Sequence, residues 1–228
     1  MKHAGKATRA GLKLVYWTLF LLLASMLAGM LAILLGTVMV QVAGVLAGLW
    51  VVFGLFTLYF FRDPEREVPT APEAIVSPGQ GKVDVIDEVT EPEFMGGRCR
   101  RVSMFLSVFD VHVQRSPVAG HLAFCKHTPG QFVNAMRADS AAYNENVLLG
   151  FASLEQPGER IGVRLIAGLI ARRIVVWATP GEQVARGERI SLIQFGSRVE
   201  VYLPLSTRVN VKVGDHARVG ATVLATRN

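Results

Sequence analysis

Residues 193–204 read IQFGSRVEVYLP, and this stretch decides how the second half of the chain folds. From Val199 to Leu203 the run is rich in β-branched and aromatic residues, which predicts a strand. The Gly196-Ser197 pair just before it is a common turn dipeptide. On its own such a pair is almost always a turn and nothing more, so the surrounding sequence must decide whether it carries chemistry.

Two similar segments flank this stretch. Residues 181–190 (GEQVARGERI) and 214–223 (GDHARVGATV) each have glycines six positions apart, an acid after the first glycine and a β-branched residue three positions after the second. Glycine serves turns that need a positive φ, so we interpret these glycines as structural. The pattern is typical of lipoyl- or biotinyl-like β-sandwich hybrids. Two copies are too few for a solenoid.

The chain after Ala71 reads as one β-rich domain. Short runs of β-branched and aromatic residues, separated by Gly or Pro, predict strands over 81–86, 101–106, 147–151, 162–166, 173–177 and 199–203. A helix is predicted near 131–136. We therefore predict a mainly β domain of the lipoyl/biotinyl-like hybrid class over residues 73–228. Residues 62–72, with Pro64 and Pro69 among charges, read as an extended linker.

The N-terminal part of the chain is apolar throughout. No Asp, Glu, Lys, Arg or His occurs from Leu14 to Phe61, a run of 48 residues, whereas one membrane crossing needs about 20. We predict a two-helix transmembrane hairpin within residues 1–61. Its crossings are expected over 14–35 and 40–61, with a turn at Gly36 and Thr37.

Basic residues flank the apolar run and predict its orientation. The first 61 residues hold four Lys and Arg and no acid, so they carry +4 of the net charge of +6. Lys13 before the run and Arg62 after it place both ends, and the following domain, on the cytoplasmic side of the inner membrane. A cleaved signal peptide fits poorly because the apolar stretch is too long. The basic pI of 9.7 reflects this tail and does not indicate nucleic-acid binding.

Familiar cofactor and metal motifs do not occur. The sequence has no GxxxxGK[ST] loop, no GxGxxG between a strand and a helix, no HExxH and no paired CxxC. We therefore expect no metal. Cys99 and Cys125 have no CxxC spacing, and a reduced, buried pair is the favoured interpretation.

One segment does combine chemically useful side chains. Residues 109–117 (FDVHVQRSP) place an acid, an imidazole and a guanidinium within six positions. If the segment is extended, Asp110 and His112 point to the same face, because side chains alternate along a strand. Imidazole suits proton transfer near neutral pH. The alternative is a polar loop with a hydrogen-bonded histidine.

Taken together, these segments resemble the short, type A (archaetidylserine-decarboxylase-like) form of the phosphatidylserine decarboxylases. The similarity covers most of residues 60–224. It rests on FFRDP at 60–64, DVHV with RSP at 110–117, HTPG at 127–130, IAGLIARRI at 166–174, RGERI at 186–190 and FGSRVEVYLP at 195–204.

The resemblance implies a specific chemistry. The Gly196-Ser197 bond would break itself, and Ser197 would become a pyruvoyl group, the covalent cofactor, at the start of a 32-residue C-terminal chain. That group would accept the electrons released as carbon dioxide leaves phosphatidylserine and phosphatidylethanolamine forms. The implied partners are the phospholipid, the membrane and the two cleaved chains as a heterodimer, with a symmetric homodimer as a further expectation.

The resemblance also suggests roles for side chains. His112 is expected to transfer protons in processing or decarboxylation. Arg115 and Arg198 are expected to bind the carboxylate or phosphate of the substrate. A structural ion pair is the alternative for Arg115, and an ordinary solvated side chain is the alternative for Arg198.

This sequence departs from the wider family in three places. Gln80 stands where many members have an acid before the last glycine of SPGQG, residues 77–81. Arg115 stands where longer members carry a second histidine, and YNEN at 143–146 stands where many short forms have Asn-Glu-Arg. The first departure removes the usual acid partner of the processing base. The candidates to replace it are Asp84, Asp110 and Glu145.

Two other function classes compete with this one. A non-enzymatic membrane adaptor with a lipoyl-like β-domain would explain the hairpins and the apolar run. It would not be a cofactor carrier, because no Lys lies at either hairpin tip. A hydrolase using Ser197, His112 and Asp110 is a third possibility, but no GxSxG surrounds the serine.

Overall fold

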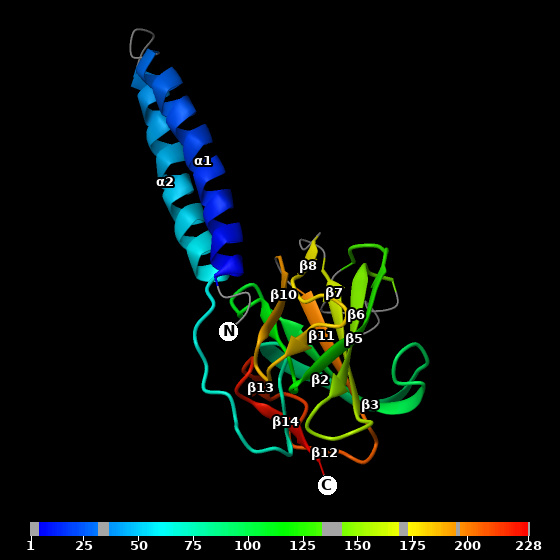
Figure 1. Ribbon diagram of the computed structural model, residues 1–228. Helices are drawn as coiled ribbons and strands as arrows, with labels where there is room; N and C mark the ends of the chain where they lie inside the picture. Colours follow the sequence, from blue (N-terminus) through cyan, green and yellow to red (C-terminus); the bar gives the residue numbers. More distant parts are fainter. Residues whose placement is uncertain (1–4, 32–36, 134–142, 169–172, 195–196, 228) are drawn as a thin grey trace. The chain divides into compact units, whose positions relative to one another are not determined.

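The computed structural model describes residues 5–31, 37–133, 143–168, 173–194 and 197–227 (Figure 1). The chain divides into two compact units, one from Gly5 to Asp63 and one from Pro64 onward. Each unit is described by itself.

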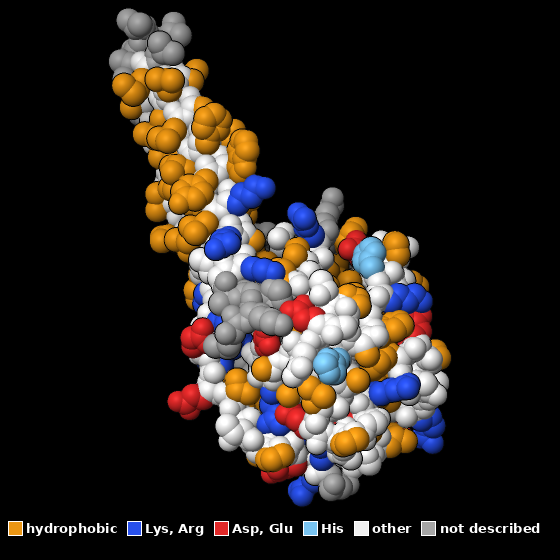
Figure 2. Space-filling view, viewed as in Figure 1, with side chains coloured by type: hydrophobic (Ala, Val, Ile, Leu, Met, Phe, Trp, Pro, Cys, Tyr) orange, Lys and Arg blue, Asp and Glu red, His pale blue; other side chains and the backbone are white. Residues whose placement is uncertain are grey.

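The first unit is a pair of antiparallel helices, α1 (Lys6–Leu31) and α2 (Thr37–Phe60). Glycines let the helices approach closely: a Cβ on Gly11 would lie 2.8 Å from the Cβ of Phe61, and one on Gly29 would lie 3.2 Å from that of Ala43. Both helices are long and apolar enough to cross a membrane. Apolar side chains cover much of their visible surface (Figure 2). The prediction of two apolar helices is confirmed.

The helix bounds differ from the expected ones. Helix α1 begins at Lys6, eight positions before the uncharged run, because Lys, Arg and Ala in the preceding tail are good helix formers. Thr37 was expected in the turn but belongs to α2. Gly36, the other expected turn residue, lies outside the described residues.

The second unit is mainly β, as predicted. Its strands are β1 (Ala74–Val76), β2 (Gly81–Glu91), β3 (Gly97–Leu106), β4 (Val113–Arg115), β5 (Gly120–Thr128), β6 (Asn146–Ser153), β7 (Arg160–Ala167), β8 (Ile174–Val176), β9 (Gln183–Val184), β10 (Arg189–Ile193), β11 (Ser197–Leu203), β12 (Arg208–Val209), β13 (His216–Ala217) and β14 (Val223–Thr226).

These strands form one curled sheet of eight strands and two sheets of three. The large sheet has the order β13-β2-β3-β11-β7-β6-β5-β9, and the small sheets are β1-β14-β12 and β4-β10-β8. The named strands pair antiparallel, as in β11 with β3 and β7. All six predicted strands are present. The other eight strands were not foreseen: β1, β4, β5, β9, β10, β12, β13 and β14.

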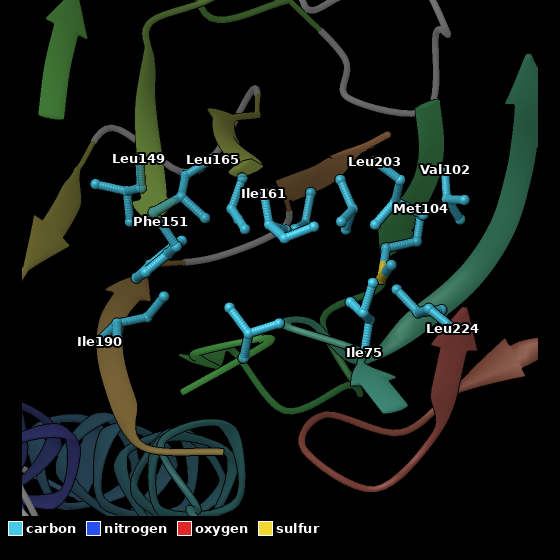
Figure 3. Packing of buried hydrophobic residues seen from close by; sticks show 14 of the residues in the cluster. Ile75, Val102, Met104, Leu149, Phe151, Ile161, Leu165, Ile190, Leu203 and Leu224 are labelled. Carbon is cyan, nitrogen blue, oxygen red and sulfur yellow. The ribbon is translucent and has the colours of Figure 1, made fainter. Parts of the chain in front are cut away.

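The core lies between the large sheet and the small ones (Figure 3). Leu149, Phe151 and Leu165 come from β6 and β7 of the large sheet, whereas Ile190 comes from β10 and Ile75 from β1. All five side chains are fully buried. Burial of an aliphatic or aromatic side chain of this size contributes about 1.5–3 kcal/mol.

The repeated glycine segments form the expected turns. Gly181, Gly187, Gly214 and Gly220 have φ values of 87°, 73°, 102° and 71°, the region that favours glycine. The two repeats also dock in equivalent ways, through main-chain bonds from Gly187 to Ser116 and from Gly220 to Ser77, both 2.8 Å. The two segments that accept these bonds are joined to each other by bonds from Val76 to Pro117 and from Arg115 to Pro78, both 3.0 Å. The repeat is therefore structural, and the lipoyl-like hybrid class stays a prediction.

Residues 64–72 form no helix or strand, yet they are held along the domain surface, and we call them the strap. Buried Arg189 pairs with Glu65 at 2.7 Å, and this bond lowers the pKa of the Glu65 carboxyl. Arg186 donates to the carbonyls of Pro69 (2.8 Å) and Ala71 (2.6 Å). Further bonds join Arg115 to Pro64 and Arg227 to Pro72.

Two smaller expectations need correction. Gln131 makes an isolated bridge with Asn144, and residues 132–133 have no helical structure; residues 134–136 lie outside the described part of the chain. Gly130 permits this bridge, because a Cβ there would lie 2.5 Å from the backbone of 143–145. Both cysteines are free, but only Cys99 is buried, and burial raises the pKa of its thiol. Cys125 is exposed because it lies in the second half of β5, where no residue from 123 to 128 is buried.

Replacement of Gly81 by Ala tests the close contact between β2 and β3. A Cβ at this position would lie 2.2 Å from the carbonyl oxygen of Phe105. Because backbone must shift to relieve the clash, we expect Gly81→Ala to destabilise the domain by about 1–3 kcal/mol in denaturant unfolding. Gly97→Ala is the matched control, since nothing lies within 4 Å of its Cβ. Equal stability of the two variants would contradict the described β2–β3 packing.

Candidate active site

Three neighbouring strands of the large sheet connect directly to three neighbouring strands of one small sheet. Residues 107–112 join β3 to β4, residues 168–173 join β7 to β8, and residues 194–196 join β10 to β11. The order is β3-β11-β7 in the large sheet and β4-β10-β8 in the small one. The connection at 194–196 is therefore the middle of three. Gly196, in the expected cleavage bond, lies outside the described residues.

Ser197 is the first residue of β11. It pairs with Leu106 on one side and Ala167 on the other, both members of the core. The side chain is fully buried, and its Oγ has no hydrogen-bond partner within the described part of the chain. A buried hydroxyl without a partner costs about 1–3 kcal/mol. Such groups are rare and are often found at reactive sites.

Charged and aromatic side chains fix the other face of β11. Buried Glu200 accepts hydrogen bonds from Arg101 (3.1 Å) and from the hydroxyl of Tyr202 (2.7 Å). Burial, and then the charge of Glu200, raise the pKa of Tyr202. A slip of one residue would exchange the two faces, so this network holds Ser197 in register on the core side.

His112 lies at the end of the first connection and is fully buried. Its Nδ1 is 3.0 Å from the carbonyl oxygen of Asp110. A carbonyl can only accept, so Nδ1 carries the proton and Nε2 is the basic nitrogen. The carbonyl of His112 accepts bonds from the N–H of Ile193 (3.2 Å) and from Gln114 Nε2 (2.7 Å). The bonds of its ring and of its carbonyl therefore fix the orientation of His112.

The hydrogen bond to Ile193 brings His112 to the connection that contains the expected cleavage bond. Ile193 precedes Ser197 by four positions. Four residues span at most about 14 Å, even fully extended. The sheet topology thus brings the two residues expected to act in catalysis to the same edge of the domain, although they are 85 positions apart in the sequence.

Asp110 does not follow the extended arrangement considered from the sequence. Residues 107–110 form a turn, closed by the bond from Asp110 N–H to the carbonyl of Ser107 at 2.9 Å. The Asp110 carboxylate accepts from Ser107 N–H (2.9 Å) and Oγ–H (2.7 Å) and also contacts His216 Nε2 (2.9 Å). Its bond to His112 runs through the main chain instead. His216 was missed because 106 positions separate it from Asp110.

Arg198 is held in a buried ion pair. Its guanidinium donates to both carboxylate oxygens of Asp84, at 2.7 and 2.6 Å, and to Ser103 Oγ at 2.7 Å. The side chain is 0% exposed. The solvated alternative for Arg198 is therefore wrong, because the strand that begins at Ser197 is covered on both faces. Its role in substrate binding stays a prediction.

Arg115 is also fully buried, at the end of β4. Its guanidinium donates to the carbonyl of Pro64 in the strap (3.0 Å) and to that of Gly187 (3.5 Å). It lies three positions after His112 and close to Gly220, whose Cβ would be 3.1 Å from Arg115 Cδ. The expected role in substrate binding is untested by these bonds and also stays a prediction.

Each acid considered as a replacement for Gln80 already has partners. Asp84 binds Arg198, Asp110 binds Ser107 and His216, and Glu145 lies 3.2 Å from His127 Nε2. Gln80 itself accepts a bond from Arg66 at 3.3 Å. Within the described residues, no group of three or more His, Cys, Asp or Glu could hold a metal ion.

Asn144 supports the edge beside Ser197, and sequence reasoning did not single it out. Its Nδ2 donates to the carbonyl of Ala167 at 2.7 Å and to that of Val133 at 2.8 Å. The neighbouring Glu145 carbonyl accepts the N–H of Ala167 at 2.9 Å. Because Ala167 pairs with Ser197, the departure noted at 143–146 falls on a segment that positions the site.

Comparisons with known proteins identify the family. A family model described as phosphatidylserine decarboxylase matches residues 53–225. The chain is 47% identical over 169 residues to the phosphatidylserine decarboxylase proenzyme of Desulfotalea psychrophila, covering 74% of this chain and 78% of that one. It is 46% identical over 180 residues to the proenzyme of Symbiobacterium thermophilum, covering 79% and 81%.

Among solved structures, glucose permease IIA from Mycoplasma capricolum has a TM-score of 0.37 and 14% identity, covering 67% of this chain and 93% of that one. A likeness this weak carries no argument about the fold or the site.

Removal of one partner tests the ion pair between Asp84 and Arg198, the residue that follows Ser197 on β11. Asp84→Asn leaves the Arg198 guanidinium buried without its carboxylate, and we expect a loss of about 3 kcal/mol in unfolding free energy. Glu88→Gln, on the same strand, removes an exposed pair with Arg98 (41% and 70% exposed) and should cost under about 1 kcal/mol. Denaturant unfolding measures both. An Asp84→Asn variant as stable as the control would contradict the buried pair.

Proposed function

The chain belongs to the phosphatidylserine decarboxylase family and is a decarboxylase of phospholipid biosynthesis made as a proenzyme, and we propose that its reactive group comes from Ser197 by self-cleavage of the Gly196-Ser197 bond. The observation that carries the proposal is the buried Ser197 Oγ without a hydrogen-bond partner in the described residues. A hydroxyl in this state loses no protein hydrogen bond when it reacts.

The cleavage rearranges bonds within the chain. Ser197 Oγ adds to the Gly196 carbonyl carbon, the Ser197 nitrogen leaves as an amine, and the amide becomes an ester. Loss of the Ser197 α-proton with breakage of its Cβ–Oγ bond then gives a Gly196 carboxylate and a dehydroalanine at 197. Water replaces its nitrogen, ammonia leaves, and a pyruvoyl group remains. Glycine suits position 196 because it has no Cβ to obstruct the attack.

The start of β11 suits a pyruvoyl group. Ser197 would hold it covalently, in apolar surroundings formed by the core residues Leu106 and Ala167. The group would supply a conjugated carbonyl that accepts an electron pair during decarboxylation. Burial limits the access of water, which protects a reactive carbonyl from side reactions.

His112 is our candidate for proton transfer. Its Nδ1–H bond to Asp110 leaves Nε2 as the basic nitrogen, and its own carbonyl is tied to Ile193 on the connection that carries the cleavage bond. Arg115 is the better of the two candidates for the carboxylate or phosphate of the substrate, because it lies on β4, three positions after His112. The Arg198 guanidinium is engaged by Asp84 and serves β11 first.

The two apolar helices suit a phospholipid substrate. We propose that they cross the cell membrane with the second unit on the cytoplasmic side, because basic residues flank both ends of the apolar run. After cleavage the large and small chains would remain together as a heterodimer, since β11 lies between β3 and β7. The family membership disfavours the adaptor and hydrolase alternatives.

Ser197→Ala tests the origin of the reactive group. The wild-type chain should separate in denaturing electrophoresis into pieces of 196 and 32 residues. The variant, which lacks the attacking hydroxyl, should stay intact and inactive. Ser206→Ala, on an exposed turn, should cleave normally. Intact mass should also show a carbonyl in place of the amine at residue 197. An uncleaved wild-type chain would contradict the proposal and favour the adaptor.

His112→Gln tests the proton-transfer role with little change in side-chain volume. Because a positioned acid or base contributes about 10²–10⁴-fold to rate, we expect cleavage, decarboxylation or both to slow at least 100-fold. His121→Gln is the control, since His121 lies on β5, three strands away from β11 in the large sheet. Rates are measured by the appearance of the small chain and by release of carbon dioxide. Wild-type rates for both steps would remove the assigned role.

A further inference from the structure

His216 is the histidine that the proposed chemistry leaves unused. It begins β13 at the edge of the large sheet, and 52% of its side chain is exposed. Its Nε2 lies 2.9 Å from Oδ1 of Asp110. The partner carboxylate is itself only 9% exposed, so His216 covers a nearly buried charge.

Asp110 links this histidine to His112. The Asp110 carboxylate is bonded to His216 on one oxygen and to Ser107 on the other. Its main-chain carbonyl accepts the Nδ1–H of His112 at 3.0 Å. The side-chain bonds fix the orientation of the Asp110 residue as a whole. That orientation decides where its carbonyl points and hence how the His112 ring is turned.

Contact between His216 and the reactive residue is excluded by strand order. The order β13-β2-β3-β11 places three strand spacings, about 14 Å, between the strand of His216 and that of Ser197. Any effect of His216 on the site therefore has to pass through Asp110. Without His216, the Asp110 carboxylate would be held by Ser107 at one oxygen. The turn over residues 107–110 is closed by the main-chain bond from Asp110 N–H to the Ser107 carbonyl.

We propose that His216 is a positioning residue: through Asp110 it holds His112 in the orientation and tautomer needed for proton transfer. The proposal rests on the proposed function only in taking His112 as the proton-transferring residue. The C-terminal chain would then provide a residue that positions the site, because His216 lies after the expected cleavage point and Asp110 lies before it. The bond would thus join the two chains of the processed enzyme at the site.

The expected effect is on rate more than on substrate binding. A misplacement of 1 Å can cost about 100-fold in rate, and loss of one of two anchors should cost less, about 10-fold. We expect His216→Ala to lower kcat about 10-fold, with KM changed less than about 2-fold. His216→Gln should restore most of kcat, because its amide Nε2–H can still donate to Asp110.

A double-mutant cycle with His112 tests the route of the effect. The full-length chain in mixed micelles of detergent and phosphatidylserine is used, and the processed fraction is quantified so that kcat refers to cleaved enzyme. If His216 acts through His112, adding His216→Ala to His112→Gln should change the rate little. His121→Ala, the control, should leave kcat unchanged and should add nothing in either background.

Three outcomes would overturn the proposal: unchanged kcat in His216→Ala, no recovery in His216→Gln, or full additivity of the two substitutions. Additivity would mean that His216 acts on stability alone, which thermal unfolding of the variants would show as a matching loss. Failure of the proposed function looks different. In that case His112→Gln itself would keep wild-type rates, whatever the His216 variants do.

Discussion

The position of β11 in the middle of the large sheet is the constraint on which the site depends. Its register with β3 and β7 sets which side chains face inward, and alternation then places Ser197 with the core residues Val199 and Val201. On the opposite face of β11, Arg198 and Glu200 are each bonded to charged partners. A slip of one residue would separate these buried charges from their partners, so Ser197 has one stable position.

The proposed active-site edge combines rigid strands with polar groups that are bonded through the main chain. His112 binds Ile193 at the end of β10, Asn144 binds Ala167 at the end of β7, and Asp110 binds the N–H of Ser107, just after β3. In the proposed cleavage a buried serine can react, because the chemistry begins inside the chain, before any substrate needs to enter.

Sequence reasoning predicted the features that depend on local pattern. The apolar helices, six strands and the positive φ values at Gly187 and Gly220 follow from composition and turn chemistry. It could not predict features that depend on distant pairing. The contact of His216 with Asp110 and that of Arg198 with Asp84 join residues more than 100 positions apart, and no local signal marks either. Of the two arrangements considered for residues 109–117, the extended one fails at Asp110 because a turn closes there from Ser107.

The strap has a consequence for how the protein is made. Its partners Arg186, Arg189 and Arg227 follow it by 114 to 155 positions. During synthesis the strap therefore leaves the ribosome long before these three side chains, so its bonds to them form only when nearly the whole chain exists, whereas its bonds to Gln80 and Arg115 can form earlier. Such distant contacts form late in folding. The strap can therefore make all its bonds only after the C-terminal segment, including the strand that begins at Ser197, has been synthesised.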